Sequence, residues 1–327
     1  ANVTKINSKD NGDIQSVTTD SQGDIAGDLF VDCTGLSSLL LGKHYGIPFV
    51  SCKNILFNDT ALAVQIPYAQ ATDNIASHTL STAQTAGWIW DIGIQSRRGV
   101  GHVFSSAHTT IERAEQELRN YIQPAVGQKM AESVAIRKIA INPGYREFFW
   151  HRNCVAIGLS AGFIEPLEST SIHLVQQGIL RLVSLFPSGG IRQSDIDEFN
   201  AQTKIETNNV RDFIILHYNT TQRTDTPFWR YCRNMTVPDS LKHKLELFRE
   251  SGKMFKVPGE LFGENNWVQV LLGQGIMPKK YHQIVDMMSD EELAAFLYSI
   301  KMSAQNLVKQ LPSHSDFLES YCKASNM

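Results

Sequence analysis

Apolar and polar residues alternate along most of the first half of the chain, with the period of two that is typical of β-strands. A hairpin is predicted at the start: Val3 and Ile6 lie in one arm, Asn11-Gly12 forms the turn, and residues 14–18 return. A helix with a charged face is predicted over 110–122. Further strand-like stretches cover residues 28–35, 61–105, 135–141 and 154–157.

After Glu168 the apolar residues recur with helical spacing. The predicted helices cover residues 171–186, 194–218, 239–251 and 291–311. Asp239 and Ser289 are expected to be N-caps, and Ser251-Gly252 is expected to end a helix. The pattern therefore predicts an α/β (α+β) chain, with a large mixed β-sheet in a first domain, 1–170, and a mostly helical second domain, 171–327.

Composition narrows the function classes. The 327 residues are 42% hydrophobic and 19% charged, which is a globular composition. A net charge of −3 gives no electrostatic reason to expect nucleic acid, and no long apolar span or basic block indicates a membrane. Five scattered cysteines are typical of reduced thiols in a cytoplasmic protein, and the histidines show no metal-binding spacing. Because the chain opens on Ala1 in strand-like alternation, we expect it to be the middle of a gene product.

One segment, GFIEPLESTSIHLV (162–175), places many polar groups at the start of an apolar helix. Gly162 would allow a close backbone approach to a ligand, and a helix start can hold an anion. Glu168 would then be a carboxylate beside an anion site. Alternatively, the hydroxyl residues that follow Glu168 are ordinary helix caps. His173, in the first turn of the helix, is interpreted as a core histidine with a satisfied partner.

Two aromatic motifs allow two interpretations each. In GWIWDIG, Trp88 and Trp90 are two residues apart and would share one face of a strand. They are core aromatics or part of a site. In TDTPFWR, Phe228 and Trp229 follow Pro227, a residue suited to a turn or to the first position of a helix. They fill a gap between helices or stack on a flat substrate.

Taken together, these pieces resemble the flavin-dependent halogenases of the tryptophan halogenase family. AGFIEPLESTSIHL resembles the family's segment between the flavin and substrate sites, and GWIWDIG resembles its WxWxIP signature. TDTPFWR resembles its substrate-side aromatic motif, and DLFVDCTG resembles the strand that closes the FAD-binding fold. The four motifs occur in the family's order over residues 28–230. The fold implied is the C-terminal part of an FAD-binding monooxygenase-like fold, followed by a helical substrate domain.

The resemblance also assigns roles to individual residues. It implies that Glu168 is the catalytic glutamate, and that Trp88 and Trp90 keep the substrate away from the flavin. Thr170 and Ser171 would bind the halide through their backbone. Substrate contacts are implied for Tyr218, Phe228 and Trp229, and cofactor contacts for Gly35, Ala161, Gly162, Phe163 and Ile172. No metal site is implied.

The implied reaction is the halogenation of an electron-rich aromatic substrate such as tryptophan or indole. Reduced FAD from a separate flavin reductase would react with oxygen to a hydroperoxide, and chloride or bromide would be oxidised to hypohalous acid. That species would travel through a tunnel to Glu168 and to a lysine. The implied partners are a small aromatic substrate, a flavin reductase and a second copy in a homodimer, with no nucleic acid and no membrane.

Several positions depart from the family pattern. The GxGxxG fingerprint and the catalytic lysine are expected upstream of this chain. Gly93 stands where WxWxIP has proline, and Ser171 stands where the best-known members have glycine. His217 and Tyr218 occupy the place expected to grip an amino-acid backbone, so a simpler indole is expected as readily as tryptophan. A monooxygenase of the same fold, or an inactive fragment of a halogenase, remains the alternative.

Overall fold

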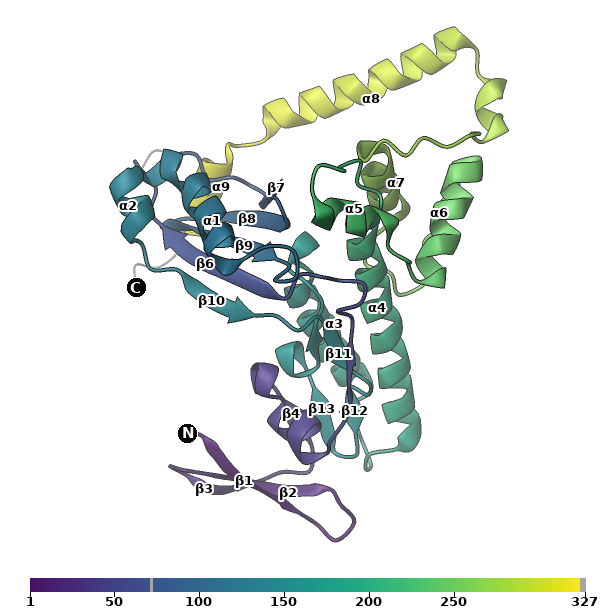
Figure 1. Cartoon of the computed structure of the whole chain (residues 1–327). Coiled ribbons are helices and arrows are strands. Elements are labelled where there is room, and N and C mark those ends of the chain that lie inside the picture. The colour runs from purple at the N-terminus through teal and green to yellow at the C-terminus, as the bar shows by residue number, and fades with distance from the viewer. Residues whose placement is uncertain (71–72, 324–327) are drawn as a thin grey trace.

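The computed structural model describes residues 1–70 and 73–323. Residues 71–72, within the long strand-like stretch, and 324–327, at the end of the predicted helical domain, lie outside the described residues. The mixed α/β class is confirmed, with the strands before α3 and most of the α-helices from α3 onward, as Figure 1 shows. The strands form four sheets. Among the described residues, β4 and β13 pair in parallel.

The predicted hairpin is confirmed as β1 and β2, which are antiparallel and joined by β3 at the other edge of β2. The two smallest sheets bring together segments that lie far apart in the chain, in the orders β12-β13-β4 and β14-β11-β5. The strands of these three sheets are β1 (Val3–Ser8), β2 (Ile14–Thr19), β3 (Gly23–Ala26), β4 (Phe30–Asp32), β5 (Phe49–Ser51), β11 (Gly144–Arg146), β12 (Trp150–His151), β13 (Cys154–Ala156) and β14 (Gly162–Phe163).

The largest sheet is antiparallel, with the order β10-β6-β9-β8-β7. Its two faces belong to different cores because side chains alternate along each strand. Ile89 and Leu62 pack against α1, while Trp88 faces the core that contains α4. The elements are β6 (Thr60–Ile66), β7 (Leu80–Ala83), β8 (Gly87–Ile94), β9 (Arg97–Phe104), β10 (Arg137–Ala140), α1 (Ile111–Val126) and α2 (Gln128–Ser133).

The second half is helical, and α4 is its central element (Figure 1). Its buried face packs against α3, α5, α6 and α7. In the view of Figure 1, α8 extends from the helical part towards α9 beside the large sheet. The helices are α3 (Thr170–Ser184), α4 (Gln193–Asn219), α5 (Pro227–Asn234), α6 (Asp239–Ser251), α7 (Glu264–Gly273), α8 (Asp290–Gln310) and α9 (His314–Tyr321).

Helix ends test the predicted caps. Ser289 is the N-cap of α8 and forms a capping box with Glu292, as predicted. Gly252 ends α6 in the left-handed conformation, which confirms the predicted stop. Asp239 as an N-cap was wrong: Pro238 holds that position, and Asp239 is the first helical residue, where its charge favours the helix dipole.

Candidate active site

A segment of ten residues, 162–171, lies between the sheets and the helices and reaches three cavities. Phe163 and Pro166 line one cavity, Leu167 lines a second, and Thr170 and Ser171 line a third. The segment runs from β14 through the short 3-10 helix η4 (Leu167–Ser169) into α3. This segment therefore contributes lining residues to all three cavities.

The backbone of this segment is strained at two successive positions. Glu168 has φ 66° and Ser169 has φ 52°, both in the left-handed region that residues with a side chain avoid. Such conformations persist where the surroundings hold them, and they concentrate at functional sites. The ordinary capping interpretation does not account for this geometry, because the N-cap Ser169 makes no side-chain cap hydrogen bond.

Glu168 is paired with a histidine from α4. Its Oε1 lies 2.9 Å from Nε2 of His217, and its side chain is 37% exposed. The hydrogen bond from His217 lowers the pKa of Glu168, more than partial burial raises it. The other ring nitrogen of His217, Nδ1, lies 2.8 Å from the carbonyl oxygen of Phe213, one turn earlier in α4. This pairing joins segment 162–171 to the central helix.

The second cavity, of about 640 Å³, lies beside this pair and is the candidate substrate site. His217 lines it, together with three of the predicted site residues, Trp88, Tyr218 and Trp229. The remaining lining residues are Ser81, Ala83, Leu167, Thr221, Gln222, Arg223, Gly273, Gln274 and Gly275. Aromatic walls with a few polar groups are typical of sites for flat ligands.

Trp229 belongs both to the cavity wall and to the core. It is 5% exposed, and its Nε1 donates a hydrogen bond of 2.8 Å to the carbonyl oxygen of Gln84. Its ring is stacked on Tyr218, with centroids 6.1 Å apart, and the Arg223 guanidinium lies 4.9 Å from its centroid. The packing interpretation is thus confirmed for this residue, and stacking on a substrate stays a prediction.

Phe228 does not line the cavity, contrary to the implied substrate contact. It is 1% exposed and lies edge-on to the rings of Tyr218 and Trp229, at 6.2 and 5.0 Å. Thr226 is the N-cap of α5, and Pro227 is its first residue. Because successive side chains of a helix point in different directions, Phe228 and Trp229 have different surroundings. Phe228 therefore supports the aromatic wall from behind.

Glu165, which the sequence interpretation did not single out, is the most buried carboxyl group of the site. Its Oε1 accepts hydrogen bonds from Trp88 Nε1 at 2.8 Å, from Asn58 Nδ2 at 2.9 Å and from the Tyr218 hydroxyl. Burial raises the pKa of Glu165, against the effect of these donors. Its carboxyl group links β8, α4 and segment 162–171. The available signal was an acidic residue directly after the apolar stretch GFI.

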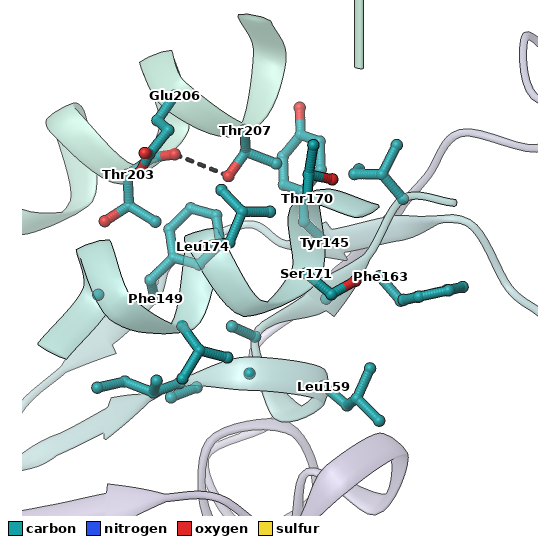
Figure 2. A pocket seen from close by; sticks show the side chains of 18 of the residues that line it. Tyr145, Phe149, Leu159, Phe163, Thr170, Ser171, Leu174, Thr203, Glu206 and Thr207 are labelled. Atoms are coloured by element: carbon teal, nitrogen blue, oxygen red, sulfur yellow. Dashed lines mark hydrogen bonds between the residues drawn. The ribbon is translucent and has the colours of Figure 1, made fainter. Parts of the chain in front are cut away.

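The third cavity, of about 160 Å³, gathers the predicted flavin and halide residues (Figure 2). Figure 2 shows it between α3 and α4, with Tyr145 and Phe149 among its walls. Of the predicted residues, Ala161, Gly162, Phe163, Thr170, Ser171 and Ile172 line it. Beside it, Oε1 of Glu206 pairs with His173 at 3.0 Å, which confirms that His173 has a satisfied partner.

Gly162 allows a close approach of two protein strands. A Cβ at Gly162 would lie 2.6 Å from the Gly144 carbonyl oxygen and from the Tyr145 Cα in β11. The close neighbour in the structure is β11, and a close approach of Gly162 to a ligand stays a prediction.

Gly35 lies in a turn that packs against residues 158–160, which directly precede Ala161 in the chain. It begins the short helix η1 (Gly35–Ser37) with φ 68°, and a Cβ there would meet no atom within 4 Å. The Ser38 hydroxyl donates to the Ser160 carbonyl oxygen, and the Ser160 hydroxyl donates to that of Asp32. These bonds hold the turn that contains Gly35 beside the short helix η3 (Gly158–Ser160) that precedes Ala161.

The two signature tryptophans share a face of β8, as predicted, with ring centroids 6.4 Å apart. They face different cavities: Trp88 lines the substrate cavity, and Trp90 lines an apolar cavity shared with Phe163 and Pro166. A Cβ at Gly93 would lie 2.8 Å from the Tyr68 hydroxyl, so a side chain at this signature position would require Tyr68 to shift.

In residues 1–70 and 73–323, no group of three or more His, Cys, Asp or Glu is arranged to hold a metal ion. Across the same residues, none of the helices combines the length and the apolar character needed to cross a bilayer.

Two solved flavin-dependent halogenases share the fold over nearly the whole chain. Xcc4156 from Xanthomonas campestris is 42% identical with a TM-score of 0.92, over 99% of this chain and 64% of its own. BrvH from Brevundimonas sp. BAL3 is 40% identical with a TM-score of 0.90, over 98% and 64%.

Sequence relatives give the same result. Tryptophan 6-halogenase SttH from Streptomyces toxytricini is 35% identical over 96% of this chain and 60% of its own length. Residues 1–290 match the tryptophan halogenase family, and the chain belongs to that family. It spans about 60 to 64% of the length of these relatives.

Proposed function

We propose that this chain carries the halide-facing and substrate-facing parts of a flavin-dependent halogenase that acts on an electron-rich aromatic ring. The observation that carries the proposal is segment 162–171. It places Glu168 beside an aromatic cavity, and residues of the same segment line the two other cavities. This arrangement suits a reaction in which the oxidant forms on one side of a wall and is used on the other.

The residues around η1, η3 and the start of α3 fit a flavin ring. Their apolar side chains are open to solvent, and Ile172 is 73% exposed beside exposed Leu36 and Leu159. A flat apolar ligand would cover such a surface. We propose that Gly35, Phe163 and Ile172 contact reduced FAD, with Ala161 and Gly162 behind them.

When bound, reduced flavin and dioxygen would supply the two-electron oxidation that makes halide electrophilic. Thr170 and Ser171, at the start of α3, offer backbone N–H groups for chloride or bromide. A separate flavin reductase would supply the reduced cofactor, and we propose that the reaction takes place in the cytoplasm.

The lining of the substrate cavity favours an aromatic substrate that carries no essential ammonium group. His217 and Arg223 line it, and its lining contains no Asp or Glu among the described residues. A bound ammonium group would therefore meet the Arg223 guanidinium and no carboxylate in the wall itself. Indoles with a neutral or acidic substituent fit better than free tryptophan. Hydroxylation by a monooxygenase is not favoured, because the similar structures are halogenases.

The test is halogenation by the complete gene product, supplied with a flavin reductase, FAD, bromide and indole. We expect a brominated product by mass spectrometry, and Glu168→Gln should lower the rate by about 10²-fold or more, as the loss of a positioned base does. Flavin oxidation should continue in this variant. Glu112→Gln, an exposed residue of α1, is the matched control and should halogenate at the parental rate.

Two outcomes would contradict the proposal. A hydroxylated product without halogen would assign the protein to the monooxygenases. An unchanged halogenation rate in Glu168→Gln would reduce Glu168 to a structural partner of His217.

A further inference from the structure

We infer that Glu168 and His217 share one proton as a carboxylate–imidazolium pair, and that His217 is a positioning residue which holds the catalytic carboxylate ionised and in place. The catalytic part of this inference rests on the proposed function. The proton-sharing part rests on geometry alone and is testable without turnover.

The contact between His217 and the carbonyl oxygen of Phe213 determines which ring nitrogen of His217 carries a proton. A carbonyl oxygen only accepts, so Nδ1 at 2.8 Å from it must carry a proton. In a neutral imidazole the second nitrogen, Nε2, is then an acceptor. Nε2 lies 2.9 Å from Oε1 of Glu168, and two acceptors do not bind each other.

The contact between Nε2 and Oε1 therefore requires a proton of its own. Imidazole is the more basic of the two groups, with a reference pKa about two units above that of a glutamate carboxyl. The proton accordingly belongs on Nε2, and the pair is an imidazolium beside a carboxylate. The lowered pKa of Glu168, which the His217 hydrogen bond causes, agrees with this assignment.

The other charged groups nearby do not replace His217 in this role. From segment 162–171 the buried Glu165 faces the same histidine, but burial raises the pKa of Glu165 and disfavours its charged form. Arg223, in the loop after α4, forms two hydrogen bonds to Asp225, at 3.0 and 2.7 Å. The facing wall residues Trp88 of β8 and 273–275 at the end of α7 are uncharged. Tyr218, the remaining titratable wall residue, has a pKa raised well above its usual value and stays neutral.

The left-handed backbone supports the same role. Successive positive φ values at Glu168 and Ser169 turn the chain sharply between η4 and α3, and they place the Glu168 side chain against α4. An unpaired carboxylate on such a turn would be free to rotate. The charge-assisted hydrogen bond to His217 fixes one oxygen and leaves the other for the substrate.

In the proposed step, hypohalous acid transfers its halogen to a ring carbon of the substrate, so the carbon–halogen bond forms as the halogen–oxygen bond breaks. The C–H bond at that carbon breaks, its electron pair restores the aromatic ring, and the proton passes to the Glu168 carboxylate. The hydroxide that leaves then takes the ring proton from Glu168 and becomes water. His217 already holds its proton and takes none. It keeps Glu168 available as a base at lower pH and in the required orientation.

The first experiment uses ¹⁵N-histidine NMR on the unmodified protein, without flavin or substrate. At neutral pH we expect both ring nitrogens of His217 to be protonated. In Glu168→Gln the proton on Nε2 should be lost, because the anion that holds it is gone. A spectrum of the parental protein with an unprotonated Nε2 would overturn the inference, whatever the enzyme does.

The second experiment compares two variants, each of which can keep one of the two hydrogen bonds of His217. His217→Gln can donate to Glu168 without a charge, whereas His217→Asn can reach only the Phe213 carbonyl. We expect the Asn variant to lose about tenfold or more in kcat, and the Gln variant to recover much of that loss. His217→Asn loses both the hydrogen bond and the charge that lower the pKa of Glu168, so the acid limb of its kcat/KM profile should move to higher pH. His217→Gln keeps a neutral hydrogen bond, so its acid limb should move in the same direction by less.

The outcomes separate the inference from the proposed function. The parental enzyme must first be shown to halogenate. If the Asn and Gln variants are then as active as the parental enzyme, or if the acid limb of their kcat/KM profiles does not move, His217 is not a positioning residue. If the parental enzyme gives no halogenated product, the proposed function fails, and the NMR result still decides whether the proton is shared.

Discussion

Trp229 shows how one residue serves both the core and the site. Its indole is almost fully buried, yet part of it forms the wall of the substrate cavity beside Tyr218. Trp229→Ala should cost about 3–5 kcal/mol in the free energy of unfolding, as the loss of a buried aromatic does. Trp229→Phe keeps a ring but loses the hydrogen bond to Gln84, so it should cost less and still raise KM for an indole.

The comparison with Phe228 makes this prediction specific. Phe228→Leu should lower the melting temperature and leave KM within about twofold, because Phe228 does not line the cavity and its replacement is apolar. Thermal melts and steady-state kinetics on all three variants decide the matter. An unchanged KM in Trp229→Phe would leave Trp229 as packing only.

At the same scale, the sequence predicted some site residues and missed others for a physical reason. Glu168, Thr170 and Trp88 lie in local motifs whose order along the chain could be read directly. The pairing of Glu168 with His217 joins residues 49 positions apart and depends on how α4 packs. The burial of Glu165 likewise depends on donors from β8 and α4, which no local pattern contains.

At the scale of the element, the left-handed step at Glu168 and Ser169 sets the geometry between η4 and α3. Ser169→Gly should raise the free energy of unfolding by about 1 kcal/mol, because glycine tolerates positive φ without the steric cost of a Cβ. Ser169→Ala is the control: it keeps the strain and removes a hydroxyl that makes no cap hydrogen bond, so it should be nearly neutral. Denaturant unfolding measures both, and a destabilised Ser169→Gly would show that the turn is not strained.

The helices illustrate what periodicity can and cannot predict. α3, α4, α6 and α8 are long enough for an apolar repeat to be recognised, and the predictions matched them to within a few residues. α2, α7 and α9 have six to ten residues and were missed. Helices this short are marginal in isolation and depend on packing, as Trp267 and Leu271 of α7 show by their burial.

At the scale of the whole molecule, the outer face of α3 is apolar and uncovered. Its exposed residues include Ile172, Ile179, Leu180 and Val183. A helix that is apolar on its outer face as well normally packs against further protein or a ligand. This face continues from the cavity at which we place the flavin, and the halogenases that share the fold are longer than this chain.

We therefore expect residues 1–327 alone to bind FAD at least tenfold more weakly than the full-length Xanthomonas campestris halogenase that shares their fold. The reason is that the dinucleotide pyrophosphate in flavin-binding folds rests on a glycine-rich turn and a helix N-terminus, and this sequence contains no GxGxxG. The corresponding 64% of the Xanthomonas protein is the matched control and should bind as weakly as this chain. A fluorescence titration with FAD measures all three proteins. Equal dissociation constants for the full-length enzyme and for residues 1–327 would show that the contacts around Gly35, Phe163 and Ile172 hold the cofactor by themselves.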